Sequence, residues 1–212
     1  MGKHAKSIDA LILKRIHAAR HDRVFTASDF LDLGSREAVD QALSRHARAG
    51  TIRKLARGLY DVPRRDPHLG LLSPSVDSIA NALRGRDAVR LQPAGAYAAN
   101  LLGLSDQVPM RIVFLTDGGG RQVRIGRLQI VLKRTTPRNM ATAGTTSGLV
   151  IQGLRHLGKQ HVDDRTLEKL RQRLSANDKA QLARDVRFAP AWVARIMKQI
   201  AEGVEGGRAA IR

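Results

Sequence analysis

The residues with the clearest capacity for chemistry are guanidinium, amide and hydroxyl side chains between residues 35 and 57. Such groups donate hydrogen bonds to the phosphates of DNA and to the edges of its bases. If residues 35–49 form a helix, its 3.6-residue period places Val39, Ala42 and Leu43 on one side and polar groups on the other. The candidate DNA-binding residues are Ser35, Arg36, Gln41, Ser44, Arg45, Arg48, Arg53, Lys54 and Arg57. Their types and spacing predict a surface for double-stranded DNA.

Capping signals indicate two short helices that would position these side chains. Thr26 with Asp29 three residues later resembles a capping box, and it predicts a short helix that Gly34 ends. Ser35 is a favourable cap for the second helix, over residues 35–49. The second helix is therefore the candidate recognition helix.

A basic hairpin is predicted directly after that helix. Residues 51–55 and 59–62 have the composition of strands, joined by a turn at 56–58. Apolar residues at helical spacing over 7–19 supply a third helix, which such a module needs to enclose a core. Together these elements predict a winged helix-turn-helix domain over residues 1–66.

Charge and composition narrow the classes of function. The chain of 212 residues carries a formal net charge of +18, and a charge of this sign favours polyanions. It has no cysteine, which excludes disulfides, cysteine-bound metals and thiol nucleophiles. The sequence shows no apolar run of membrane-spanning length and no signal-peptide pattern, so we expect a cytoplasmic protein without a membrane partner.

The remainder predicts a linker, a second domain and a tail. Prolines and Gly70 suit a linker over 67–73, a domain would occupy 74–202, and 203–212 would be a flexible tail. The fold class expected is α+β: a mixed α/β second domain with a small sheet and a helical C-terminal cap. Its predicted elements are helices at 75–83 and 95–102, strands at 88–91, 111–115, 122–125 and 128–133, and a mainly helical region over 147–199.

A second basic surface is predicted in the later part of the chain. No acidic residue occurs between Gly118 and Val162, whereas basic residues are frequent there. Six of them lie on or beside the predicted sheet: Arg121, Arg124, Arg127, Lys133, Arg134 and Arg138. A solvated basic face and a second surface for nucleic-acid phosphates explain this pattern about equally well.

Patterns typical of enzymes and of cofactor sites have simpler explanations here. The glycines at 118–120 lack the phosphate-loop pattern and predict a hairpin turn, and the segment 144–148 predicts a helix cap. His17 and His21 are four residues apart but lack the accompanying carboxylate of a zinc-binding motif. Asp163 beside Asp164 is better explained by capping than by metal binding. We therefore expect no catalytic residues, no cofactor and no metal, and we disfavour an enzyme, including a metal-dependent nuclease or nucleotidyltransferase.

Two stretches resemble the AbiEi family, the antitoxins and autorepressors of type IV toxin-antitoxin and abortive-infection systems. They are ARGLYDVP at 56–63 and LQPAGAYAANLLGLSDQVPMRIVFLTDG at 91–118, and the resemblance extends over about 7–135. It implies an N-terminal winged helix that binds inverted repeats in its own promoter and a C-terminal domain that provides antitoxicity. It also implies a cognate nucleotidyltransferase toxin, commonly countered without a stable complex. The family's DNA contacts would fall on Arg36, Gln41, Ser44, Arg45, Arg48, Arg53, Lys54 and Arg57.

The leading hypothesis is a DNA-binding antitoxin that represses its own promoter and counters such a toxin. A single winged helix gives a small interface, so we expect two copies on an inverted-repeat operator, with homodimerisation before binding left open. The alternative is a non-specific nucleic-acid or RNA-binding protein that acts through its basic C-terminal domain.

Overall fold

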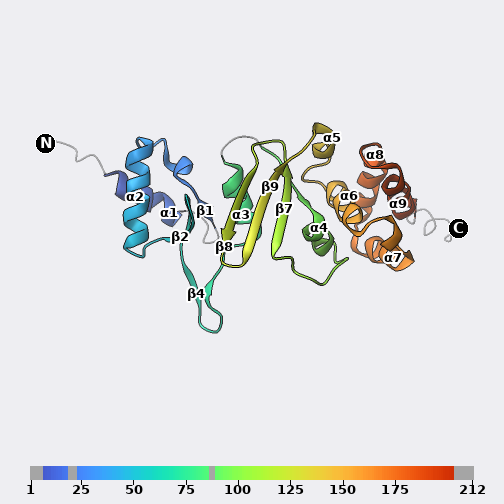
Figure 1. Ribbon diagram of the computed structural model, residues 1–212, viewed down its shortest axis with the longest axis horizontal. Coiled ribbons are helices and arrows are strands. Elements are labelled where there is room, and N and C mark those ends of the chain that lie inside the picture. Colours follow the sequence, from blue (N-terminus) through green and yellow to red (C-terminus); the bar gives the residue numbers. More distant parts are fainter. Residues whose placement is uncertain (1–6, 19–22, 86–88, 203–212) are drawn as a thin grey trace. The chain divides into compact units, whose positions relative to one another are not determined.

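A computed structural model describes residues 7–18, 23–85 and 89–202 (Figure 1). The chain divides into two compact units, residues 1–88 with 123–125 and residues 89–122 with 126–212. The architecture is mixed α/β, with small sheets and a helical C-terminal region, as the α+β prediction requires. The predicted tail and His21 lie outside the described residues. Within the described ranges, every helix is too short or too polar to cross a lipid bilayer.

The first unit packs helices against a three-stranded sheet. Its core contains aliphatic side chains from the helices and Phe25, Phe30 and Tyr60, with the Phe25 ring 5.7 Å from that of Phe30 and 6.3 Å from that of Tyr60. The sheet has the order β1-β3-β2, and both neighbouring pairs are antiparallel. The elements are α1 (Ile8–Ala18), β1 (Val24–Phe25), η1 (Ala27–Phe30), α2 (Arg36–Arg48), β2 (Arg53–Ala56), β3 (Leu59–Asp61) and α3 (Val76–Arg84).

The predicted linker is a hairpin. Residues 64–66 (β4, Arg64–Asp66) and 70–72 (β5, Gly70–Leu72) form an antiparallel pair, so residues 67–73 include the turn and second strand of a folded element. The two compact units divide after residue 88, beyond α3, and not in this segment. The proline-rich composition was misleading because prolines also occur before, within and after a short hairpin.

The next sheet has four strands, of which β6, β7 and β9 belong to the second unit. Its order is β6-β7-β9-β8, and β7 runs parallel to β9. The glycines at 118–120 therefore connect two strands that β9 separates, and the prediction of a hairpin turn there was wrong. The strands are β6 (Leu91–Ala94), β7 (Arg111–Thr116), β8 (Arg121–Ile125) and β9 (Leu128–Arg134). The predicted strand at 88–91 is thus displaced toward 91–94.

Helices complete the second unit. Leu154, Leu170, Leu182 and Met197 are fully buried in their shared core, and the predicted mainly helical region over 147–199 is confirmed. The helices are α4 (Gly95–Leu101), α5 (Pro137–Met140), α6 (Thr146–Leu157), η2 (Lys159–His161), α7 (Asp164–Arg173), α8 (Ala176–Asp185), η3 (Val186–Phe188) and α9 (Ala191–Glu202). The predicted helix caps at 144–148 and at Asp163 are confirmed.

Helix α6 lies close to strand β6 at its beginning. The Gln92 side chain is buried, and its Oε1 accepts a hydrogen bond from the Gly144 N–H at 3.3 Å. At Gly148 an added Cβ would overlap both that oxygen and the carbonyl oxygen of Thr142. Only glycine therefore fits at this position of α6.

Candidate nucleic-acid interface

Helix α2 separates apolar from polar side chains as the sequence predicts. Ser35 caps its beginning, because the Ser35 Oγ accepts a hydrogen bond from the Ala38 N–H at 3.3 Å. Val39, Ala42 and Leu43 are completely buried. The opposite side forms a shallow depression lined by Asp40, Gln41, Ser44, Arg45 and Arg48. Ser44 is half-buried and the other four are exposed, so this side of the helix is accessible.

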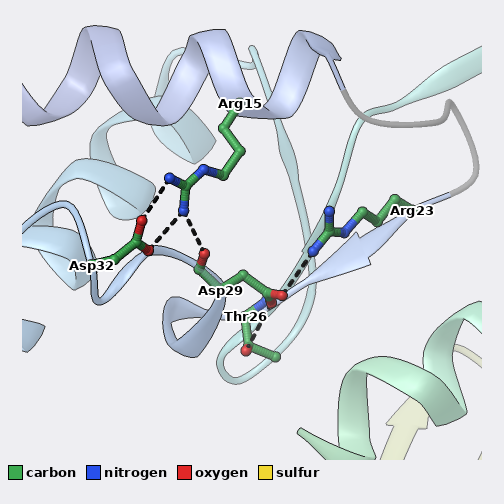
Figure 2. A network of polar contacts seen from close by, with 5 residues as sticks. All are labelled: Arg15, Arg23, Thr26, Asp29 and Asp32. Carbon is green, nitrogen blue, oxygen red and sulfur yellow. Dashed lines mark hydrogen bonds and ion pairs between the residues drawn. The ribbon is translucent and has the colours of Figure 1, made fainter. Parts of the chain in front are cut away.

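The segment before α2 is fixed by a polar network (Figure 2). From α1, Arg15 donates to both carboxylate oxygens of Asp32 at 2.7 Å and to the Asp29 carbonyl oxygen at 3.0 Å. The Asp29 carboxylate accepts from the Thr26 N–H at 2.8 Å and from Arg23 at 2.9 Å. The predicted capping box is confirmed, but the element that it begins is one 3-10 turn, η1, and not a longer helix. The network ties α1 to the turn from which α2 starts.

The end of α2 is joined directly to the hairpin. The carbonyl oxygen of His46 accepts hydrogen bonds from the N–H groups of Thr51 and Ile52, at 3.1 and 3.4 Å. On the far strand, burial raises the pKa of the Tyr60 hydroxyl, and the nearby negative charge of Asp40 raises it further. Asp40 belongs to α2 and Tyr60 to β3, so the helix and the hairpin are packed together within one unit.

Each arginine of α2 already has a partner. Arg36 donates to Asp40 at 2.8 Å, and Arg45 donates to both oxygens of Asp9 in α1, at 2.8 and 3.2 Å. These hydrogen bonds from Arg45 hold the pKa of the Asp9 carboxyl below its usual value. Arg48 donates to the Ser44 hydroxyl at 3.3 Å. Exposed ion pairs of this kind stabilise a protein by about 0.2–1 kcal/mol, so a phosphate could replace the carboxylate at small cost.

Three candidates remain available for a ligand. Gln41, Lys54 and Arg57 are exposed and have no hydrogen-bond or ion-pair partner within the part of the chain that the structure describes. Arg57 stands at the turn between β2 and β3, where Gly58 adopts a φ of 72°. A positive φ favours glycine, so Gly58 permits the tight turn that places Arg57 at the tip of the hairpin.

Arg53 has a structural role that the sequence analysis missed. Its guanidinium donates to both carboxylate oxygens of Asp61, at 2.9 and 2.5 Å, and to the Leu72 carbonyl oxygen at 2.8 Å. Asp61 is only 4% exposed. Arg53 and Asp61 are direct register partners across the hairpin, a signal that the predicted strands already contained. Because these bonds occupy its guanidinium, we remove Arg53 from the expected DNA contacts.

The six cations of the predicted second basic surface are all exposed. Across the described ranges, none of them has a hydrogen-bond or ion-pair partner. Five belong to the second unit, whereas Arg124 falls within the strand segment 123–125 that groups with the first. In β9, Lys133 and Arg134 pair with Leu115 and Thr116 of β7, so their side chains leave opposite faces of the sheet.

No group of three or more His, Asp or Glu side chains in the described residues is placed to hold a metal ion. A comparison with protein families matches residues 11–182 to a family described as a family of unknown function, DUF6088. A search of curated proteins gave no match.

Proposed function

The chain belongs to the DUF6088 family of unknown function, and we propose that it is a sequence-specific DNA-binding protein whose first unit is a winged helix-turn-helix. The carrying observation is the division of α2, with Val39, Ala42 and Leu43 buried while Gln41 and Arg45 are exposed. The basic hairpin attached to the end of the helix supports the same function. In this proposal α1, η1 and α2 are the three helical elements, and β2–β3 is the wing.

The proposed complex places the beginning of α2 in the major groove. Arg36 and Gln41 would contact base edges there, because guanidinium and amide groups match the donors and acceptors of guanine and adenine. Lys54 and Arg57 would bind phosphates beside the groove. Arg36 and Arg45 would exchange their carboxylate partners for DNA. Two copies on an inverted repeat would supply the area that one small module lacks.

Alanine variants test this division of roles. We expect Arg36→Ala and Gln41→Ala to weaken specific binding by about 1–3 kcal/mol per residue and to relax sequence preference. Arg57→Ala should weaken binding to all sequences and reduce the salt dependence by about one counterion. Lys169→Ala, an exposed position on α7, removes the same charge as a control. The target DNA can be selected from random duplexes, and binding can be measured at several salt concentrations. Equal losses on selected and random DNA for all three variants would contradict the proposal.

The antitoxin role is a separate proposal that depends on the AbiEi resemblance. We expect the protein to bind inverted repeats in its own promoter and to suppress the toxicity of a nucleotidyltransferase encoded beside it, without a stable complex. Co-expression of the two genes, with growth as the readout, tests this directly. The absence of any such neighbouring gene, or toxicity that this protein does not reduce, would reject the antitoxin role and leave the DNA-binding proposal intact.

A second candidate function is non-specific binding of nucleic acid, including RNA, by the basic C-terminal residues. It is favoured by the six exposed cations, for which the described residues offer no partner. Competition between selected duplex DNA and RNA separates the two functions. Replacing Arg121, Arg127 and Lys133 by Gln should abolish RNA binding in this alternative, and should leave the choice of DNA sequence unchanged in the leading proposal.

A further inference from the structure

The hairpin β4–β5 follows the proposed wing in the chain but is not part of it. Two residues separate it from the proposed wing strand β3, and its labelled strand β4 extends away from the helices of the first unit (Figure 1). The proposed wing anchors β5, the second strand of this hairpin, because Arg53 of β2 donates to the Leu72 carbonyl oxygen. The hairpin is thus a direct extension of the proposed DNA-binding module.

One face of this hairpin carries an exposed leucine beside an exposed arginine. Arg65 and Leu71 are register partners, so their side chains share a face. Leu71 is 48% exposed, and Leu69, two residues earlier at the turn, is 77% exposed. Pro67 is also exposed in this turn. A tip with two exposed apolar residues beside an exposed arginine suits a ligand that has both apolar surfaces and negative charge.

The tip is held in a defined conformation. The Asp66 carboxylate accepts hydrogen bonds from the N–H groups of His68 and Leu69, at 2.8 and 2.9 Å. These two bonds also hold the pKa of Asp66 below its usual value. Gly70 adopts a φ of 73° where the chain enters β5. Little backbone conformational entropy is therefore lost at Leu69 when its side chain enters a binding partner.

A second copy of the chain fits this face poorly. Stable interfaces bury at least about 1,000 Å², far more than the few exposed side chains of two three-residue strands provide. The net charge of +18 also opposes association between copies. DNA offers the matching combination, because stacked bases are apolar and the adjoining phosphates are negative. Minor-groove proteins insert Leu or Pro between base steps and bind the backbone with neighbouring cations.

We propose that β4–β5 is a second DNA-contacting arm, in which Leu69 and Pro67 insert between base steps from the minor groove and Arg65 binds an adjacent phosphate. This inference depends on the proposed DNA-binding function and adds a deformation of the duplex to it. The insertion partly unstacks the bases and bends the DNA, so sequences that kink easily are preferred at positions that α2 never touches.

The decisive variant is Leu69→Ser, with Val108→Ser as a matched control. Val108 is 76% exposed in the loop before β7, so the same loss of an exposed apolar side chain occurs outside the first unit. The full-length protein is added to a selected duplex with dyes at both ends, which reports bending by energy transfer. Duplexes with 2-aminopurine at successive steps report unstacking.

We expect the wild-type protein and Val108→Ser to bend the duplex and to raise 2-aminopurine fluorescence at one step. Leu69→Ser should lose both signals and bind roughly tenfold more weakly, in line with the loss of one buried leucine side chain. Arg65→Gln should lower the slope of log affinity against log salt by about 0.9. Circular dichroism, compared among all four proteins, checks that each is folded.

Each other outcome has a definite meaning. If the wild-type protein binds without bending the duplex, or if Leu69→Ser bends it equally, the proposal of a second DNA-contacting arm is wrong and the proposed function is unaffected. Failure of the wild-type protein to bind any duplex would overturn both. If Leu69→Ser changed the sedimentation of the protein in the absence of DNA, this face would be a contact between copies, and the insertion would be wrong.

Discussion

Replacing Arg53 by glutamine should destabilise the first unit without removing a DNA contact. Asp61 is only 4% exposed, and the substitution leaves its carboxylate without a counter-charge. It also removes the bond to the Leu72 carbonyl oxygen. Breaking a fully buried ion pair from one side costs about 3–5 kcal/mol. Because the Arg53 side chain is 22% exposed, we expect a loss of about 2–4 kcal/mol in the free energy of unfolding.

The structure supplies a control on the same hairpin. Arg57→Gln removes the same charge four residues away, but Arg57 is exposed and no described residue pairs with it. Its stability should therefore change by less than about 0.5 kcal/mol. The two variants should show opposite patterns, with Arg53→Gln losing stability and Arg57→Gln losing DNA affinity.

Calorimetry and circular dichroism measure the thermal transition. For a unit of this size the expected loss corresponds to a decrease in Tm of roughly 10–20 °C. The single tryptophan of the chain, Trp192, packs against the core of the second unit, so its fluorescence follows that unit separately. The double variant Arg53→Met with Asp61→Leu should recover stability, because it removes both charges. A wild-type Tm for Arg53→Gln, together with a loss of DNA affinity equal to that of Arg57→Gln, would refute the structural role.

Three other contacts in the described structure lead to testable predictions. Asp9→Asn removes the negative charge that holds Arg45, so affinity for DNA should rise and the salt slope should steepen by about 0.9. Fluorescence anisotropy measures both, and unchanged binding would show that this pair does not restrain Arg45. Gly148→Ala should lower the free energy of unfolding of the second unit by about 1–3 kcal/mol, because the added methyl group would overlap Gln92. Denaturation followed by tryptophan fluorescence measures this loss. Hydrogen bonds from Ser175 and from Thr146 hold the pKa of the Asp178 carboxyl below its usual value. The stability that this carboxylate contributes should thus be fully present above its unfolded pKa of about 3.9 and should be lost as the pH falls through the lower folded pKa. Asp178→Asn should flatten that acid loss in urea titrations at successive pH values.

Local signals predicted the elements of the candidate interface well. Ser35 and the period of apolar residues located α2 to within one residue at each end, because a cap and a buried stripe depend only on nearby sequence. The two strands of the hairpin β2–β3 were also found, since a glycine at the turn fixes their spacing. The two-residue strand β1 was missed, because so short a segment has no detectable alternation.

Pairings between distant residues could not be obtained in the same way. Nothing near β7 indicates that its neighbour is β9, because parallel register depends on packing across the sheet. Asp9 is 36 residues from Arg45, and only the fold brings α1 beside α2. The Arg53–Asp61 pair is different, because counting residues outward from the predicted turn would have revealed it. The sequence therefore located the accessible side of α2, whereas the partners that occupy its arginines required coordinates.

The strand order of the second unit has a consequence for synthesis of the protein. The strand that covers one side of β7 is β9, which is translated after β8. A ribosome that has not yet reached residue 128 therefore presents a nascent chain in which β7 can pair only with β6. Its other edge is then free to pair with foreign strands, and Ile112 and Phe114, both buried in the finished protein, lack part of their cover. Prematurely terminated chains that end in the turn at Gly126 should consequently aggregate, whereas chains that extend past β9 should not.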